Sequence, residues 1–217
     1  ARASVAAVHE LRTGRLDVAS MPSQAVEPLT TLIRIYSHRY PGVVVSVKAV
    51  FTAREVIDAV RTGTVELGLL ACAGPLPEKE VSTLALKQQR FVLLVPPDDP
   101  LAGRFSVARE ELSGRRLIVG QRGTGMRAYV DSLHEQGVAF EVATEIEHRV
   151  ALLPLVLAGV GLAVVTESWR NLAHSSARVL NIEPATALNI GLASRRGALS
   201  PAASAFLATA RAEPGAC

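Results

Sequence analysis

Small hydroxyl residues beside predicted helix starts are the first feature of this sequence that could bind a charged ligand. The loop Ser20-Met21-Pro22-Ser23 leaves a segment of strand-like alternation and leads into a helical one. Free N–H groups and the helix dipole attract anions at such a junction. The hydroxyls of Ser20 and Ser23 are therefore candidate ligand contacts. The alternative is that they only cap a turn, and both interpretations stay open.

A glycine-rich stretch in the second half is the next candidate. Residues 123–128 (GTGMRA) match the G-x-G-x-x-G/A pattern of dinucleotide sites, and Glu145 lies 20 residues beyond Gly125. The loop begins several residues after its strand, however, and no second mononucleotide unit follows in series, so nicotinamide binding is disfavoured. A simpler interpretation is an anion site with Thr124 as donor and Arg122 as countercharge. A loop with solvated arginines is the alternative.

Catalytic chemistry finds little support. Cys72 follows a predicted buried strand, and His148 follows a strand in the second half. A nucleophilic cysteine needs a nearby histidine, but a free cysteine is more often a small buried apolar residue; a redox role stays open. The five histidines show no metal-ligand spacing. The sequence thus predicts a binding protein without cofactor or metal, and not an enzyme.

The composition predicts a folded chain that does not itself grip nucleic acid. Of its 217 residues, 49% are hydrophobic, and 23 basic against 20 acidic residues give a net charge of only +3. The basic residues form no stripe, and only 4% of residues are aromatic, too few for a base-stacking platform. The most apolar stretch, 150–165, contains a proline and two glycines and is shorter than the ~20 residues that span a bilayer. We expect a soluble protein with no membrane contact.

An α/β scaffold must position these candidates. Periodicity and breaker residues predict strands and helices that alternate along the chain. The first strand is expected to start at Arg15. Further strands are expected at 43–50, 65–70, 81–87, 91–95, 116–119, 140–146, 161–165, 178–182 and 187–193. Helices are expected at 28–39, 53–61, 125–136, 149–158 and 201–211, with a helical turn at 107–112.

The order of elements occurs twice. The strands at Arg15 and Arg116 start 101 residues apart, and the glycines that close the second helices, Gly63 and Gly159, are 96 apart. This offset predicts two lobes of the same α/β design. A ligand cleft is expected between them, faced by the carboxyl ends of parallel strands.

Six motifs follow one another over about residues 14–212. They are Tyr40-Pro41-Gly42-Val43, RTGTVELGLL (61–70), FVLLVPPDDPLA (91–102), EELSG (110–114), LVLAGVGLAVV (155–165) and SPAASAFLATAR (200–211). Together they resemble the effector-binding domain of the LysR-type transcriptional regulators. The sequence departs from the family pattern at three places: Glu66 replaces an aspartate, Asp99 replaces a histidine, and Val165-Thr166 replaces a closing Leu-Pro.

The resemblance implies two Rossmann-like lobes joined by two crossover strands, the type II periplasmic-binding-protein-like class. Lobe I would comprise residues 14–94 plus 193–212 and lobe II residues 95–192. Residues 1–13 would be the end of a linker helix that follows an N-terminal winged helix-turn-helix. That missing domain, and not this chain, would contact DNA in the cytoplasm.

The resemblance also implies a ligand set and a homodimer. The helix at 28–39 of one copy would pair with the helix at 125–136 of another in an antiparallel arrangement, and the full-length protein could be a tetramer. Arg122, the hydroxyls and the helix N-termini predict an anionic effector, a small carboxylate in particular. An extracytoplasmic solute-binding protein for a small organic anion is the alternative. The implied ligand contacts are Ser20, Met21, Ser23, Thr52, Cys72, Gln121, Arg122, Thr124 and Thr166.

Overall fold

The chain divides into two compact units. The computed structural model describes residues 13–213. Unit 1 contains the chain up to Gln88 and from Asn189 onward, and unit 2 contains Gln89 to Leu188. The linker helix predicted at 1–13 lies outside the described residues, apart from its last position, and the predicted lobe limits stay predictions.

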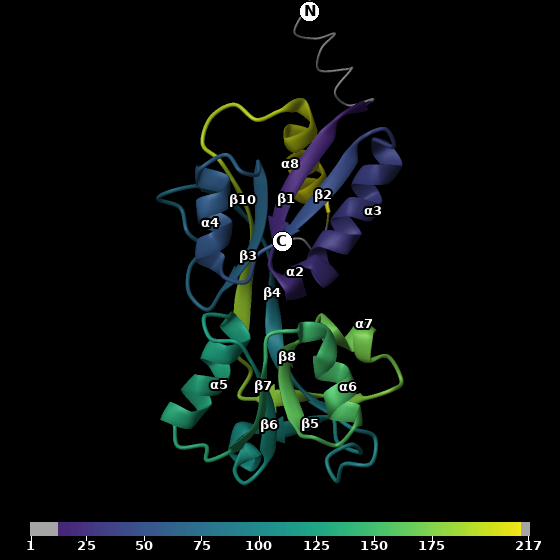
Figure 1. Ribbon diagram of the computed structural model, residues 1–217, viewed down its shortest axis with the longest axis vertical. Helices are drawn as coiled ribbons and strands as arrows, with labels where there is room; N and C mark the ends of the chain where they lie inside the picture. The colour runs from purple at the N-terminus through teal and green to yellow at the C-terminus, as the bar shows by residue number, and fades with distance from the viewer. Residues whose placement is uncertain (1–12, 214–217) are drawn as a thin grey trace, which may run out of the picture. The chain divides into compact units, whose positions relative to one another are not determined.

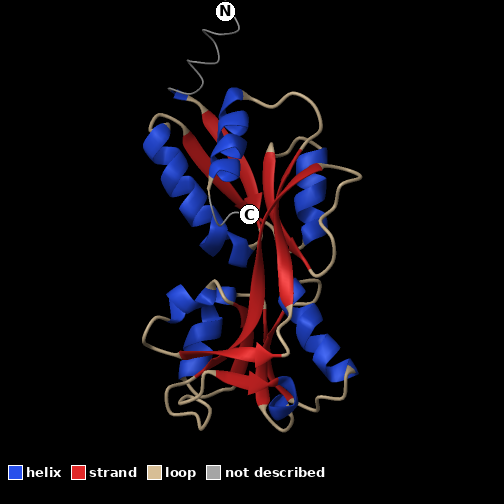
Figure 2. Ribbon diagram, turned by 180° about the vertical axis from the view of Figure 1, so that it is seen from behind, coloured by secondary structure: helices blue, strands red, loops and turns tan. Residues whose placement is uncertain are grey.

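Unit 1 is built on three parallel strands. β1 (Arg15–Ser20) lies between β2 (Val44–Ala49) and β3 (Leu67–Cys72), and β10 (Ala187–Ser194) pairs antiparallel with β3. Helices α3 (Thr30–Arg39) and α4 (Ala53–Arg61) lie on opposite sides of these strands (Figures 1 and 2). A short helix α2 (Pro22–Gln24), a π-helical segment η1 (Ala25–Leu29) and α8 (Pro201–Ala212) complete the unit.

The core of unit 1 fixes α8 against α3. Tyr36 is fully buried, and its hydroxyl donates a hydrogen bond to the carbonyl oxygen of Ala202 at 3.1 Å. Its ring lies 5.1 Å from the ring of Phe206, centroid to centroid. A buried tyrosine hydroxyl needs such a partner, so this pair sets how the last helix docks.

Unit 2 repeats the design. β6 (Arg116–Gly120) lies between its parallel neighbours β7 (Glu141–Ile146) and β8 (Leu162–Thr166), and β4 (Ser82–Val95) pairs antiparallel with β8. Strand β9 (Arg178–Glu183) pairs with β4 and with the short β5 (Ser106–Ala108). The helical segments are η2 (Arg109–Leu112), α5 (Gly125–Glu135), η3 (Arg149–Ala151), α6 (Leu152–Leu157) and α7 (Trp169–Ala173).

The strand orders β2-β1-β3-β10 and β7-β6-β8-β4 have the same directions, so the two-lobe design predicted from spacing is confirmed. In each unit the carboxyl ends of the parallel strands share one edge of the sheet. None of the helices between residues 13 and 213 is long and apolar enough to cross a membrane.

Several predicted elements differ from the structure. The helical turn expected at 107–112 begins only at Arg109, since residues 106–108 form the strand β5. The strands expected at 81–87 and 91–95 are one strand, β4, because the polar run between them stays extended and buries Gln89 to 1% exposure. The helix expected at 28–39 begins as α3 only at Thr30, because Glu27 has extended backbone angles (φ −153°, ψ 127°) that interrupt the turn before it.

Glycine is required at the two positions before β8, Gly159 and Gly161, for different structural reasons. Gly159 has a φ of +73°, which favours glycine. A Cβ atom on Gly161 would lie 2.8 Å from the carbonyl oxygen of Arg116, at the start of neighbouring β6. That oxygen belongs to the backbone and cannot rotate away, so Gly161 permits the close pairing of β6 and β8.

We expect Gly161→Ala to lower the free energy of unfolding by about 1–3 kcal/mol, because the added methyl group forces β6 and β8 apart. Urea denaturation of the purified chain measures this. Gly103→Ala is the matched control, because a Cβ there meets nothing within 4 Å. Equal unfolding midpoints for the two variants would contradict the steric argument.

Candidate functional site

Hydrogen bonds within the loop and to β3 hold the loop that follows β1. Ser20 is 1% exposed, and its hydroxyl donates to the carbonyl oxygen of Met21 at 3.1 Å. The amide of Met21 donates to the carbonyl oxygen of Leu69 on β3 at 3.4 Å. Ser23 is also buried, inside the three-residue helix α2. The loop is therefore rigidly held, and the Ser20 hydroxyl proton is already bonded.

Thr52 is the N-cap of α4. Its hydroxyl oxygen accepts from the amide of Glu55 at 3.2 Å, while the Glu55 carboxylate accepts from the amides of Thr52 (2.9 Å) and Phe51 (2.7 Å). These backbone hydrogen bonds hold the pKa of Glu55 below its usual value. The start of α4 thus already has a carboxylate bound to it, and Thr52 is engaged in this cap.

Cys72 ends β3 as a protonated thiol. Its Sγ atom donates to the carbonyl oxygen of Gly74 at 3.3 Å, and burial raises the thiol pKa. The thiolate is the nucleophile, so this environment disfavours both attack and oxidation. Cys72 belongs to unit 1 and His148 to unit 2.

The loop between β6 and α5 turns through Gly123, whose φ is +84°, and is closed by Thr124. The Thr124 hydroxyl donates to the carbonyl oxygen of Gln121 at 3.0 Å and accepts from the amide of Arg127 at 3.3 Å. Thr124 is 3% exposed, whereas Arg122 is exposed to solvent. Of the predicted contacts in this loop, Arg122 has the freest side chain.

Arg127 is a structural residue that the sequence analysis did not single out. Its guanidinium binds Asp131 at 2.8 Å, the carbonyl oxygen of Gly120 at 3.1 Å and Glu145 at 3.0 Å. It therefore joins α5 to the ends of β6 and β7. Glu145, the acidic residue of the dinucleotide pattern, is already held in this ion pair and is not available to a ribose. The i,i+4 spacing of Arg127 and Asp131 was the one signal in the sequence.

Arg149 is a second residue that the sequence analysis missed. It lies three residues after β7, and its Nη1 atom donates to Sδ of Met126, a buried residue in the first turn of α5, at 3.3 Å. Burial lowers the pKa of Arg149 to about 10. The guanidinium thus keeps its charge at neutral pH although its surroundings disfavour it. A lone arginine at a predicted helix start carries no sequence signal for this.

Thr166 ends β8 and is fully buried. Its hydroxyl lies 2.8 Å from that of Ser168, and one donates to the other. The next residue, Trp169, is 5% exposed, and its buried indole nitrogen has no hydrogen-bond partner among the described residues. The end of β8 therefore carries three buried polar groups, two hydroxyls and one indole N–H.

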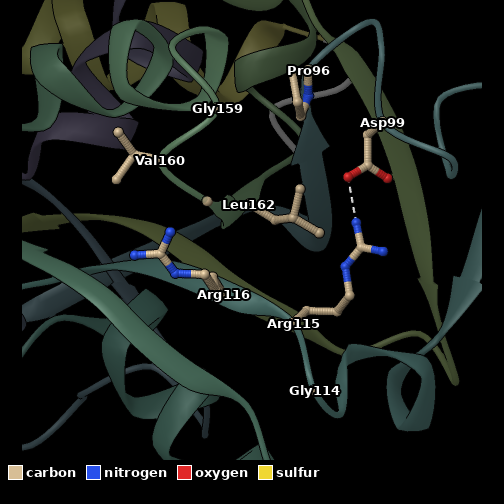
Figure 3. A pocket seen from close by; sticks show the side chains of 9 residues that line it. Pro96, Asp99, Gly114, Arg115, Arg116, Gly159, Val160 and Leu162 are labelled. Carbon is tan, nitrogen blue, oxygen red and sulfur yellow. Dashed lines mark hydrogen bonds and ion pairs between the residues drawn. The ribbon is translucent and has the colours of Figure 1, made fainter.

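A pocket of about 330 Å³ lies at the other ends of the unit 2 strands, beside Arg116 at the start of β6 and Leu162 at the start of β8. Figure 3 shows Arg115 directed toward Asp99, with which it forms an ion pair, while Arg116 extends in another direction. Arg116 is 3.6 Å from Glu141. The arginine charges here are matched by carboxylates, so this pocket has no excess charge for an anion. Asp99, the departure from the family's histidine, has a structural partner in Arg115.

No group of His, Cys, Asp and Glu side chains in the described part of the chain could hold a metal ion. The structure leaves the predicted contacts as two groups of strand-end residues, one in each unit. Unit 1 carries Ser20, Met21, Ser23, Thr52 and Cys72, and unit 2 carries Gln121, Arg122, Thr124 and Thr166.

A family model described as the LysR substrate binding domain matches residues 9–215. The chain belongs to the LysR substrate-binding domain family. The type II periplasmic-binding-protein-like class predicted from the motifs is thereby confirmed, and so is the expectation of a non-enzymatic binding domain. The chain spans about 60–65% of the length of curated relatives that it matches.

Relatives and solved structures agree. The chain is 32% identical over 212 residues to a protein of Streptomyces viridosporus named "Probable hydrogen peroxide-inducible genes activator", covering 93% of this chain and 65% of that protein. The regulatory domain of CcmR from Synechocystis PCC6803, solved with 2-PG, has a TM-score of 0.72 at 22% identity, covering 85% of this chain and 89% of that one. The effector-binding domain of QuiR, solved with shikimate, has a TM-score of 0.76 at 22% identity, covering 91% and 95%.

We expect Cys72 to react with iodoacetamide several-fold more slowly in the folded chain than in urea at pH 8, because its raised pKa leaves less thiolate. The pH at which the reaction reaches half its maximal rate should also be higher in the folded chain. A Cys217→Ser background confines the label to Cys72. Equal rates in both states would show that the thiol is reactive after all.

Proposed function

We propose that this chain is the effector-sensing domain of a LysR-type transcriptional regulator and that its effector is a small carboxylate. The observation that carries the proposal is the family match over nearly the whole chain, combined with buried hydroxyl groups at the carboxyl ends of the parallel strands. Ligands of parallel α/β sheets bind at that edge. DNA would be contacted through an N-terminal winged helix-turn-helix, in the cytoplasm.

The strand-end residues of both units supply the proposed contacts. Thr124 and Thr166 are too buried to move freely and act as fixed walls, whereas Gln121 and Arg122 reach solvent and supply donors. Shikimate, named with the related QuiR domain, carries a carboxylate, which supports this class of ligand. The remaining proposed contacts are Ser20, Met21, Ser23, Thr52 and Cys72.

A thermal-shift screen of organic acids against their neutral amides tests the ligand class. We expect one or more carboxylates to raise the melting temperature by several degrees at millimolar concentration, and the matching amide to raise it far less, because ligand binding to the native state alone stabilises it. Benzoate with benzamide and shikimate with its amide are suitable first pairs. Stabilisation by amides only would reject the carboxylate class.

We further propose that two copies of the chain pair through the outer edges of their sheets. β2 and β7 end the strand order of their units, and each exposes apolar side chains: Val44 is 61% exposed and Val142 50%. Open apolar edges normally pair or are covered. A second copy fits, because one chain carries both edges and an antiparallel pair covers β2 of one copy with β7 of the other.

Exposed apolar residues outside the two edge strands refine the proposal. The dimer expected from the resemblance uses the helix at 125–136, but the exposed positions of α5 include Ala128, His134 and Glu135, which offer little apolar area. The segment after β7 exposes Val150 (86%) and Leu157 (42%) instead. We therefore assign the unit 2 side of the interface to β7 and to the segment that directly follows it, up to η3, with β2 and α3 on the unit 1 side.

Val44→Asp and Val150→Asp should each weaken the dimer at least tenfold, because each places a charge in an apolar interface. Sedimentation velocity from 1 to 100 µM, an experimental range chosen to bracket roughly micromolar association, measures the change. Phe105→Asp, at a position 80% exposed, is the matched control and should leave association unchanged. A wild-type chain that stays monomeric throughout, or variants that dimerise like it, would reject this interface.

A further inference from the structure

The open sheet edge of unit 1 is basic. Residues 30–49, which form α3, β2 and the turn between them, contain no aspartate or glutamate, and their basic residues are Arg34, Arg39 and Lys48. All three side chains are exposed, and none forms an ion pair with another residue of the described chain. Lys48 lines a hollow together with Glu55 and Asp58, but backbone amides already bind Glu55, and arginines bind Asp58. We call residues 30–49 the basic edge.

The open sheet edge of unit 2 is acidic. Residues 135–148, which contain β7, include no lysine or arginine, and their acidic residues are Glu135, Glu141, Glu145 and Glu147. All four side chains are exposed. Arginines of neighbouring elements lie beside Glu141 and Glu145, which leaves Glu135 and Glu147 without a cation among the described residues. Arg149, the next basic residue, is only partly exposed. We call residues 135–148 the acidic edge.

Apolar area alone does not determine which edges pair. Val44 on β2 and Val142 on β7 are exposed to a similar extent, so β2 could equally cover β2 or β7 of a second copy. Charge distinguishes these arrangements, because like charges that face one another across an interface repel and opposite charges attract. Two basic edges or two acidic edges therefore repel. Only a basic edge against an acidic edge is attractive.

The antiparallel dimer contains this favourable contact twice. In a two-fold dimer, the contact of one residue with another is repeated with the two copies exchanged. The basic edge of each copy thus meets the acidic edge of the other. Exposed ion pairs add little affinity because water screens them, but complementary potentials steer the encounter and exclude wrong pairings.

We propose that opposite charge selects the edge pairing, so that the basic edge of one copy accepts only the acidic edge of a second copy of this chain. This inference rests on the proposed dimer and names what determines its partner edge. The exposed valines supply contact area, and the charges around them supply direction. Charge on an open strand edge also discourages the addition of other strands, so an occupant of the basic edge must bring negative charge.

Ionic strength provides the first test. The Debye length falls from about 10 Å at 0.1 M salt to about 3 Å at 1 M, so the dissociation constant of the wild-type dimer should rise by about tenfold between these NaCl concentrations. Sedimentation velocity measures this constant. Screening acts on charges and not on apolar contacts, so a constant that stays the same or falls would contradict the proposal.

Charge reversal provides the sharper test. The basic-reversed variant carries Arg34→Glu, Arg39→Glu and Lys48→Glu, and the acidic-reversed variant carries Glu135→Lys, Glu141→Lys and Glu147→Lys. Each variant alone should dimerise about tenfold more weakly than the wild type, because like charges face one another at both contacts. An equal mixture of the two should associate like the wild type, because both contacts of the mixed dimer again join opposite signs. Thermal melting verifies that each variant folds.

A chain with all six substitutions exchanges the signs of the two edges. It should dimerise with itself, but a tagged wild-type chain should not capture it, because every contact of that mixed dimer joins like charges. The control carries Lys79→Glu, Arg90→Glu and Arg178→Glu, three exposed positions outside both edges. It changes the net charge as much as the basic-reversed variant does and should dimerise like the wild type.

The outcomes separate this inference from the dimer on which it rests. If the wild type stays monomeric, the dimer and the selection by charge both fail. If the wild type dimerises, Val44→Asp weakens it and the reversed variants associate normally, the interface stands and only the selection by charge is overturned. If the reversed variants are weak and their mixture is equally weak, the charges do not select the partner edge, and the inference is likewise overturned.

Discussion

Parallel pairing of strands is the constraint on which the arrangement of this protein depends. Parallel neighbours place every carboxyl end at the same edge, so β1, β2 and β3 end together in unit 1, and β6, β7 and β8 end together in unit 2. Residues that are distant in sequence therefore become neighbours at one edge. Gly161 serves this constraint directly, since a Cβ atom there would meet the backbone of β6 and prevent the close approach of β6 and β8.

Hydrogen bonding at that edge distinguishes the residues that hold the scaffold from those that could contact a ligand. Hydroxyl residues at helix starts serve the chain first: Thr52 and Thr124 cap α4 and α5, and Ser20 bonds the carbonyl oxygen of the next residue. Arg127 does the same for charge, since it pairs with two carboxylates while fixing the ends of β6 and β7.

Much of the fold follows from local sequence. Alternation, periodicity and breaker glycines predicted most strands and helices, and the repeated spacing predicted two copies of one design. The merged strand β4 was missed because its polar centre, including Gln89, does not show the apolar alternation on which strand prediction relies. The kink at Glu27 depends on a backbone conformation that residue type alone does not specify.

The candidate site was less accessible to sequence analysis. Capping roles for Thr52 and Thr124 follow from local spacing, but the ion pair of Arg127 with Glu145 joins residues 18 positions apart, and the burial of Arg149 depends on packing against another element. Such pairings have no fixed spacing in sequence. The sequence predicted which loops at the strand ends carry the candidate contacts. It did not predict how charged residues pair at these loops, because their partners become neighbours only in the folded chain.

How the two units share the chain determines the order in which they can fold during synthesis on the ribosome. Unit 2 is one continuous segment, residues 89–188, whereas unit 1 takes residues from both sides of it. During translation, β3 has no partner on one side until β10 emerges more than 100 residues later, and the Tyr36 hydroxyl lacks its acceptor, the Ala202 carbonyl oxygen, until α8 follows β10. Unit 2 can therefore complete its sheet first. Until β10 is synthesised, the first half of unit 1 leaves an apolar sheet edge open to chaperones.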